Sequence, residues 1–207
     1  KIRLIPDAFH GDWNYAFDQN DAEELIMYFV TIPKRCLPAD LIGRIEHFGS
    51  TAVPGLAAKP IIDMLVEVRS LDETKERIVP ILEALGYDYF WRPTWGDDVP
   101  PFYAWFIKRD AAGRRTHHIH MIEPHFEHWQ RLFFRDYFIS HPQTARQYQD
   151  LKLHLAQKYP NDRIAYTRAK SDFIVRITAL AREFDGTLKG DGTAKIDIDI
   201  QKQLWLP

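Results

Sequence analysis

A loop between two strand-like segments is the feature that most constrains the fold of this chain. Residues 44–48 alternate between polar and apolar side chains, which is typical of a strand. A loop over residues 49–60 follows and contains two glycines and two prolines. Residues 61–68 then form a mostly apolar run of strand length, which suits a central strand covered on both faces. The sequence therefore predicts two strands joined by an irregular loop.

The residues of this loop are suited to binding an anion. Gly49 has no side chain to keep a ligand away from the backbone, and the hydroxyls of Ser50 and Thr51 can bond phosphate oxygens. Successive backbone N–H groups in such a turn form an anion nest, to which Lys59 adds positive charge. Asp63, on the next strand, can hold Mg²⁺. The alternative is an ordinary Gly-Ser-Thr turn, with Asp63 capping a neighbouring loop.

A dense group of histidines lies on a later strand-like run. Strand alternation places His118 and His120 on one face, about 6.6 Å apart along the backbone, and His117 on the other. Two such imidazoles can converge on one metal or one phosphate, and they favour Zn²⁺, Mn²⁺ or Fe over Mg²⁺. They can also act as acids or bases near neutral pH. The alternative is half-buried polar packing beside Tyr103 and Trp105.

Several basic residues could complete the site. We expect four of them at its mouth, each with an ordinary surface charge as the alternative: Arg115, Arg135, Lys152 and Lys170. Arginine is well suited to phosphate because its fork binds two oxygens at once. The histidines on helices or turns are expected to be solvated: His125, His128, His141 and His154.

The remaining segments predict a sheet followed by helices. Strand-like runs cover residues 2–5, 87–91, 102–108 and 115–122, the last two joined as a hairpin. Apolar residues at helical spacing predict helices over residues 12–32, 72–85, 126–139, 142–159 and 162–184. This order indicates an α/β (α+β) fold with a helical C-terminal half. We expect one domain over residues 1–185, with its sheet core in about 1–123, its helical part in about 124–185, and 186–207 as a tail or added edge strand.

The composition of the sequence indicates which kinds of binding partner and which cellular setting to expect. The 207 residues include 27 basic and 29 acidic ones, so a net charge of -2 gives no electrostatic reason to expect nucleic acid or a membrane surface. No stretch approaches the ~20 apolar residues that a membrane helix needs. The one cysteine, Cys36, cannot form an internal disulfide, and the N-terminus lacks a secretory pattern. We therefore expect a cytoplasmic setting, and the oligomeric state stays open.

The run HFGSTAVPGLAAKPIID, residues 47–63, resembles the signature of the GrpB family. Further similarities follow in the family's order: His118-Ile119-His120, then Phe134-Arg135-Asp136-Tyr137 and His141-Pro142. The resemblance covers roughly residues 2–182. The GrpB family belongs to the nucleotidyltransferase superfamily, so the resemblance implies a mixed sheet of the polymerase beta type.

The resemblance also implies roles for individual residues. The superfamily pattern is Gly-Ser, a spacer and then Asp-x-Asp or Asp-x-Glu, which makes Ser50 a phosphate ligand and Asp63 a metal ligand. The sequence departs from the pattern at Leu65, where the second carboxylate would stand. Glu67 lies about 13 Å along the strand from Asp63 and cannot share its metal. We expect the paired histidines to occupy the place of the missing carboxylates, opposite Asp63.

Three functions fit these residues. The first is transfer of a nucleoside monophosphate from an NTP, most simply ATP, to an unknown acceptor, with Mg²⁺ or Mn²⁺ bound, or Zn²⁺ through the histidine pair. The second is a nucleotide- or metabolite-binding module that has lost the transfer chemistry. The third is a metal-dependent phosphoester hydrolase that uses the two histidines.

Overall fold

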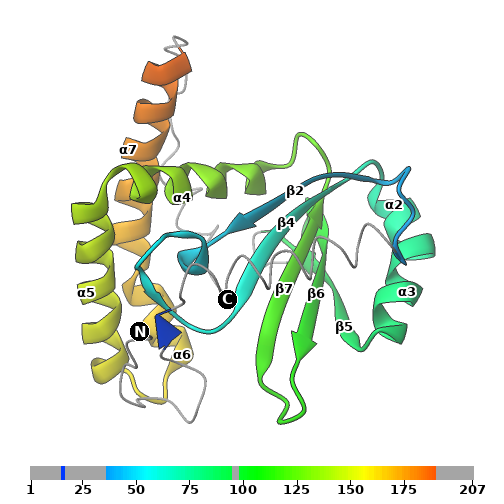
Figure 1. The fold of residues 1–207 in the computed structure, drawn as a ribbon, viewed down its shortest axis with the longest axis horizontal. Helices are drawn as coiled ribbons and strands as arrows, with labels where there is room; N and C mark the ends of the chain where they lie inside the picture. The colour runs from blue at the N-terminus through cyan, green and yellow to red at the C-terminus, as the bar shows by residue number, and fades with distance from the viewer. Residues whose placement is uncertain (1–14, 17–35, 95–97, 190–207) are drawn as a thin grey trace.

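The computed structural model describes residues 15–16, 36–94 and 98–189 and contains a five-stranded sheet (Figure 1). In spatial order its strands are β2 (Ile42–Phe48), β4 (Ile62–Val68), β7 (Arg115–Ile122), β6 (Phe102–Arg109) and β5 (Tyr87–Pro93). The β4–β7 pair is parallel and the other pairs are antiparallel. The predicted α/β class with a mixed sheet is therefore confirmed.

A smaller pairing lies beside the loop. Strand β1 (Tyr15–Ala16) pairs antiparallel with β3 (Ala57–Ala58). The helix predicted over residues 12–32 is therefore wrong at these two positions, because their backbone bonds to β3 in an extended form. The rest of that segment, the strand predicted over residues 2–5 and most of the tail over 186–207 lie outside the described residues.

One face of the sheet is covered by a short helical segment. It consists of α2 (Leu71–Glu73), a π-helical turn η2 (Thr74–Ile78) and α3 (Val79–Ala84), close to the predicted span. The side chain of Ser70 accepts a hydrogen bond from the backbone N–H of Glu73 and so caps the segment. Met64, Val66 and Phe106 are buried in the core on this face. Because strand residues alternate, the odd-numbered residues of β4 point to the opposite face.

The C-terminal helices pack beside the other face of the sheet (Figure 1). They are a 3-10 turn η3 (Glu127–Gln130), α4 (Arg131–Ser140), α5 (Pro142–Lys158), α6 (Arg163–Ala169) and α7 (Ser171–Lys189). The single helix predicted over residues 162–184 is thus two helices with a break at Lys170, and it continues beyond Phe184. Neither Gly nor Pro marks the break, so the periodicity alone does not reveal it.

No helix within the described ranges has both the length and the apolar content that crossing a bilayer requires.

Candidate metal and phosphate site

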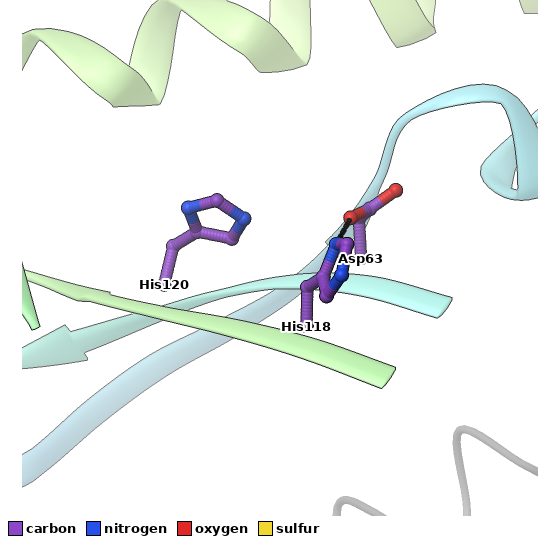
Figure 2. Close-up of side chains that lie close together, drawn as sticks. All are labelled: Asp63, His118 and His120. Atoms are coloured by element: carbon purple, nitrogen blue, oxygen red, sulfur yellow. Dashed lines mark hydrogen bonds and ion pairs between the residues drawn. The ribbon is translucent and has the colours of Figure 1, made fainter. Parts of the chain in front are cut away.

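Asp63 and His118 form the centre of the site (Figure 2). They are partners in the parallel pairing of β4 with β7, so their side chains leave the sheet side by side on the same face. The imidazole Nδ1 of His118 lies 2.9 Å from the carboxylate Oδ1 of Asp63. The histidine strand therefore lies beside Asp63 on the neighbouring strand. The expectation that it stands opposite Asp63 is corrected, because β7 is parallel to β4 and hydrogen-bonded to it.

His120 lies two residues further along β7 and points to the same face (Figure 2). The residue is 6% exposed, and its ring stacks on Tyr103 with 5.5 Å between ring centroids. Phe48 also contacts it in a T-shaped arrangement, with 5.3 Å between ring centroids. Burial, reinforced by the positive charge of Arg131, lowers the pKa of His120 well below its usual value. The imidazole is therefore neutral near pH 7, which is the form that binds metal ions.

Asp63, His118 and His120 together fit a divalent metal ion. Each offers one ligand atom, and these atoms lie within 4.8 Å of one another. The buried His118 Nε2 and His120 Nδ1 have no hydrogen-bond partner among the described residues. Two imidazole nitrogens with one carboxylate oxygen is a donor set typical of Zn²⁺ or Mn²⁺. Among the described residues this is the one group of three or more such side chains close enough for one ion.

The loop before β4 brings backbone against this cluster. Gly49 has φ 78 and ψ -168, and the short 3-10 helix η1 (Ser50–Ala52) follows. The hydroxyl of Thr51 is buried and donates to the carbonyl of Ile61 at 3.2 Å. His47 Nε2 lies 2.9 Å from the same hydroxyl, and burial lowers the pKa of His47 to about 4. Thr51 thus links the start of the loop to Ile61, the residue just before β4. Thr51 has one hydroxyl proton, and it uses this proton in the bond to Ile61. The predicted hydrogen bonds to phosphate must therefore come from the neighbouring residues of the loop.

Helix α5 reaches back to the loop through Lys152. Its ammonium donates to the hydroxyl of Ser50 at 3.1 Å and to the carbonyl of Ala57. Gln149, nearly one turn earlier on α5, accepts from the backbone N–H of Ala57 at 2.8 Å. Burial lowers the pKa of Lys152 to about 7, and the charge of Lys170 adds to this effect. The helical half of the chain therefore holds the loop and adds a cation whose charge varies near neutral pH.

These groups line one cavity of about 310 Å³. It contains most of the predicted site: Gly49, Ser50, Thr51, Lys59, Asp63, His118, His120, Lys152 and Lys170. Among the described residues its walls carry four cationic side chains, Lys59, Arg131, Lys152 and Lys170, against the single carboxylate of Asp63. Such a surplus of positive charge in a confined space attracts a polyanion.

Two of the predicted cations are not part of the cavity wall, which corrects that expectation. Arg135 donates to the carboxylate of Glu46 at 2.9 Å and to the carbonyl of His47 at 2.8 Å, so it ties α4 to β2. Arg115 is not among the residues that line the cavity, and its guanidinium lies 5.7 Å from the ring centroid of Trp105. Helical and strand periodicity give the face of a basic residue but not the reach of its long side chain.

His128 is also not where the sequence predicts it. The residue is 1% exposed rather than solvated, because η3 turns its side chain against Tyr103, with 4.6 Å between ring centroids. Arg131 Nη2 donates to its Nε2 at 3.1 Å.

Sequence reasoning missed Arg131 and the polar residues of the helical wall, namely Tyr148, Gln149, Tyr166 and Thr167. A signal for Arg131 existed. It precedes Phe134 by three residues and Phe138 by seven, and both phenylalanines are buried. This spacing puts Arg131 on the inner face of α4.

Comparisons with known proteins identify relatives over most of the chain. A family model described as GrpB protein matches residues 8–180. A UPF0157 protein of Pseudomonas aeruginosa is 42% identical over 144 residues, which are 66% of this chain and 54% of that protein. The UPF0157 protein YqkA of Bacillus subtilis is 39% identical over 177 residues, which are 84% of this chain and 45% of that protein. The matched part is thus about half the length of these two relatives.

One solved structure is similar over most of the chain. The crystal structure of the conserved protein GrpB from Enterococcus faecalis has a TM-score of 0.70 and 31% identity, covering 81% of this chain and 96% of that one. A structure of Cid1, described as an RNA terminal uridylyl transferase, has a TM-score of 0.46 and 16% identity over 74% of this chain and 46% of that one, too distant to transfer a residue's role. Because the family model spans most of the sequence, this chain belongs to the GrpB family.

Proposed function

We propose that this chain is a metal-dependent nucleotidyltransferase, which transfers a nucleoside monophosphate from an NTP, most simply ATP, to an acceptor. The observation that carries the proposal is the composition of the cavity. Four cations, a glycine-serine loop and the Asp63–His118–His120 cluster line the same space. Residues 47–63 resemble the signature of the GrpB family, which belongs to the nucleotidyltransferase superfamily, and this resemblance supports the same assignment.

In this proposal the phosphates of the NTP lie between the loop and helix α5. Ser50 and the backbone N–H groups after Gly49 donate hydrogen bonds to the phosphate oxygens. Lys152, already 3.1 Å from the Ser50 hydroxyl, and Lys170 neutralise the triphosphate charge from the helical side. Lys59, on the same cavity wall, adds to this charge. The loop and the helices thus contribute different groups to one phosphate site.

Asp63, His118 and His120 would hold the divalent ion, which when bound supplies positive charge to the phosphoryl group undergoing transfer. In the reaction, an oxygen or nitrogen of the acceptor forms a bond to the α-phosphorus. The bond from the α-phosphorus to its bridging oxygen breaks, pyrophosphate leaves, and the acceptor's proton passes to solvent. The chain's own contribution is to align the two reactants and to exclude water from the buried imidazoles.

The binding module is the main alternative, and one observation favours it. Leu65 stands where the superfamily has its second carboxylate, and it is completely buried among Phe48, Tyr103 and Leu132. A two-metal arrangement built on a second acid of β4 is therefore excluded at that position. The hydrolase alternative rests on the histidine pair alone.

One set of assays separates the three functions. We would measure pyrophosphate release from ATP with Mn²⁺ and a mixture of small acceptors, for the wild type, Asp63→Asn, and Asp150→Asn as a control on the exposed face of α5. The transferase predicts acceptor-dependent pyrophosphate release that Asp63→Asn abolishes and Asp150→Asn leaves unchanged. A thermal shift with ATP but no pyrophosphate release would indicate the binding module. Release of phosphate or AMP without an acceptor, lost on chelation, would indicate the hydrolase.

A further inference from the structure

A row of side chains leads from the metal cluster to the edge of the sheet, outside the cavity. Trp105 on β6 pairs with His120 across the β6–β7 ladder, and its ring centroid lies 5.1 Å from that of His118. Phe90 on the edge strand β5 pairs with Trp105, with 5.5 Å between ring centroids. Because these rings contact one another, they lie on the same face of the sheet as the metal cluster. Neither Phe90 nor Trp105 lines the cavity.

Phe90 offers an exposed aromatic surface in this row. The residue is 40% exposed, whereas Trp105 is half-buried. The ring of Trp105 is contacted by Phe90, His118 and Arg92, so Trp105 supports its neighbours rather than offering a face of its own. An exposed aromatic ring is well suited to stacking with a planar ring such as a nucleobase, because every base has a π-face.

Arg92 adds an unpaired positive charge to the same surface. Its guanidinium lies 4.6 Å from the ring centroid of Trp105, and across the described ranges it makes no hydrogen bond or ion pair. None of its nitrogens is both buried and without a partner, so solvent reaches the unpaired ones. Asp88, on the same face of β5, bonds instead to Arg109 at 2.8 Å. A guanidinium held flat on an aromatic ring keeps its in-plane N–H groups for an anion such as phosphate.

The position of these residues outside the cavity separates the two reactants of the proposed transfer. The NTP lies in the cavity, where Lys152 and the glycine-serine loop bind its phosphates in that proposal. His118 belongs to both regions, since it lines the cavity and its ring contacts Trp105. A molecule that reaches the metal cluster from Phe90 therefore comes from outside the cavity, as a second reactant must. The net charge of -2 gives no basis for binding a long polyanion, which favours a single nucleotide over a strand.

We propose that Phe90 and Arg92, supported by Trp105, form an acceptor subsite for a mononucleotide, whose base stacks on Phe90 and whose phosphate binds Arg92. The inference rests on the proposed transfer reaction and names the class of its acceptor. A ribose hydroxyl oxygen of the acceptor forms the bond to the α-phosphorus of the NTP. The bond from that phosphorus to its bridging oxygen breaks, pyrophosphate leaves, and the hydroxyl proton passes to solvent.

Calorimetric titrations on the full chain, first saturated with Mn²⁺ and a non-hydrolysable ATP analogue, test the subsite. The probes are AMP, adenosine, which lacks the phosphate, and ribose 5-phosphate, which lacks the base. We expect the wild type to bind AMP about tenfold or more tightly than either of the other two. Phe90→Leu should weaken AMP binding about fivefold or more and leave that of ribose 5-phosphate unchanged. Arg92→Gln should weaken AMP and ribose 5-phosphate by a similar factor and leave adenosine unchanged.

Two matched controls make the same chemical changes elsewhere. Phe102→Leu alters an aromatic residue on the other face of the sheet, where Phe102 stacks on Trp91. Arg176→Gln removes a guanidinium that lies 5.2 Å from the ring centroid of Phe173 on α7. Neither control should change the affinity for any of the three probes.

Two conservative variants decide the question if Phe90→Leu or Arg92→Gln does not fold. Phe90→Trp has a larger ring and should bind AMP at least as tightly as the wild type does. Arg92→Lys keeps the charge but not the planar fork, and it should retain part of the phosphate contribution. Loss of AMP binding in Phe90→Trp, or a normal affinity for ribose 5-phosphate in Arg92→Lys, would count against the subsite.

Other outcomes would overturn the inference directly. Equal binding of the three probes by the wild type, or a preference for AMP that survives in both folded variants, would exclude the subsite. Weaker binding of the ATP analogue itself to Phe90→Leu or Arg92→Gln would assign the surface to the NTP rather than to the acceptor. A short oligoadenylate that binds more tightly than AMP would exclude a single nucleotide. If the analogue does not bind but AMP shows the predicted pattern, the transferase is refuted and the nucleotide subsite is supported.

Discussion

The backbone of Gly49 lies so close to the carboxylate of Asp63 that a Cβ built at residue 49 would come 3.0 Å from Asp63 Oδ2. Gly49 also has φ 78 and ψ -168, a region of backbone conformation that is essentially restricted to glycine. The loop can therefore approach the proposed metal ligand only because this residue lacks a side chain. Gly49 therefore links the loop proposed to bind phosphate to the cluster proposed to bind metal, and this link can be tested directly.

We expect Gly49→Ala to lower the free energy of unfolding by about 1–3 kcal/mol and to weaken Mn²⁺ binding, because the methyl group both strains the backbone and displaces the Asp63 carboxylate. Gly55→Ala is the matched control in the same loop. Gly55 also has a positive φ of 73, but nothing lies within 4 Å of a Cβ built there. Denaturant unfolding and calorimetry with Mn²⁺ measure the two effects. If Gly55→Ala weakened Mn²⁺ binding as much as Gly49→Ala does, general loop strain rather than contact with Asp63 would be responsible.

The buried histidines predict a loss of stability in mild acid. Burial lowers the pKa of His47 to about 4 and that of His117 to about 3, and it lowers the pKa values of His120 and His128 as well. Between these values and the ordinary pKa near 6.5, the unfolded chain binds protons that the folded chain does not. The free energy of unfolding is therefore highest above pH 6.5 and falls as the pH drops toward 4.

Urea denaturation at pH 7.5, 6.5, 5.5 and 4.5 measures this decline. His117→Gln should make the fall in the free energy of unfolding shallower, because the buried His117 is one of the groups that cause it. His117 lies on the face of the sheet away from the site. His154→Gln, on the exposed side of α5, should leave the profile as in the wild type. A wild-type stability that stays constant from pH 7.5 to 4.5 would contradict the expectation.

The charge of Lys152 should make the affinity for nucleotide depend on pH, and Lys152→Met should remove that dependence. Burial lowers the pKa of Lys152 to about 7, so its ammonium is charged below neutral pH and loses its proton above it. A charged ammonium attracts phosphate and a neutral amine does not. We expect the wild type to bind a non-hydrolysable ATP analogue with Mg²⁺ about tenfold more tightly than Lys152→Met at pH 6. This ratio should approach one by pH 8.5.

The ATP analogue itself changes its ionisation with pH, but this change affects both proteins equally. It therefore cancels in the ratio of the wild-type affinity to the Lys152→Met affinity. Lys158→Met makes the same chemical change at the exposed end of α5 and should bind like the wild type at every pH. A Lys152→Met defect of constant size from pH 6 to 8.5 would show that the residue acts by holding the Ser50 loop rather than by its charge.

The local part of the site could be predicted from the sequence because it depends on short-range patterns. The alternation of residues 115–122 places His118 and His120 on one face, and the glycine-serine loop leads directly into the strand that carries Asp63. The contact between Asp63 and His118 could not be predicted from periodicity, because it depends on β4 and β7 being parallel neighbours in a particular register. Two strands far apart in sequence do not specify that register locally.

The wrong predictions for Arg135 and His128 also concern contacts between segments that are distant in sequence. Arg135 is one residue from a buried phenylalanine on α4, yet its side chain turns to Glu46 and His47 on β2, a contact that only tertiary packing determines. The sequence predicts that His128 is solvated, but the turn η3 directs it against Tyr103. Long or polar side chains near the edge of a sheet can point to water or inward, and the sequence does not decide between them without the position of the helix above.

Leu65 provides the sharpest test of whether this site works without a second carboxylate. It is completely buried, packs against Phe48, Tyr103 and Leu132, and pairs with His120 across the β4–β7 ladder. We expect Leu65→Asp to lower the free energy of unfolding by roughly 3 kcal/mol or more, because a carboxylate in this apolar cluster loses its hydration and the leucine contacts. Leu65→Met is the control, since it keeps an apolar side chain of similar volume and should cost less than about 1.5 kcal/mol.

A folded Leu65→Asp variant with higher pyrophosphate release than the wild type would instead mean that the apolar residue is what limits catalysis. Unchanged or lower release, with the expected loss of stability, would mean that a carboxylate at residue 65 adds nothing to the metal site proposed at Asp63 and the two histidines.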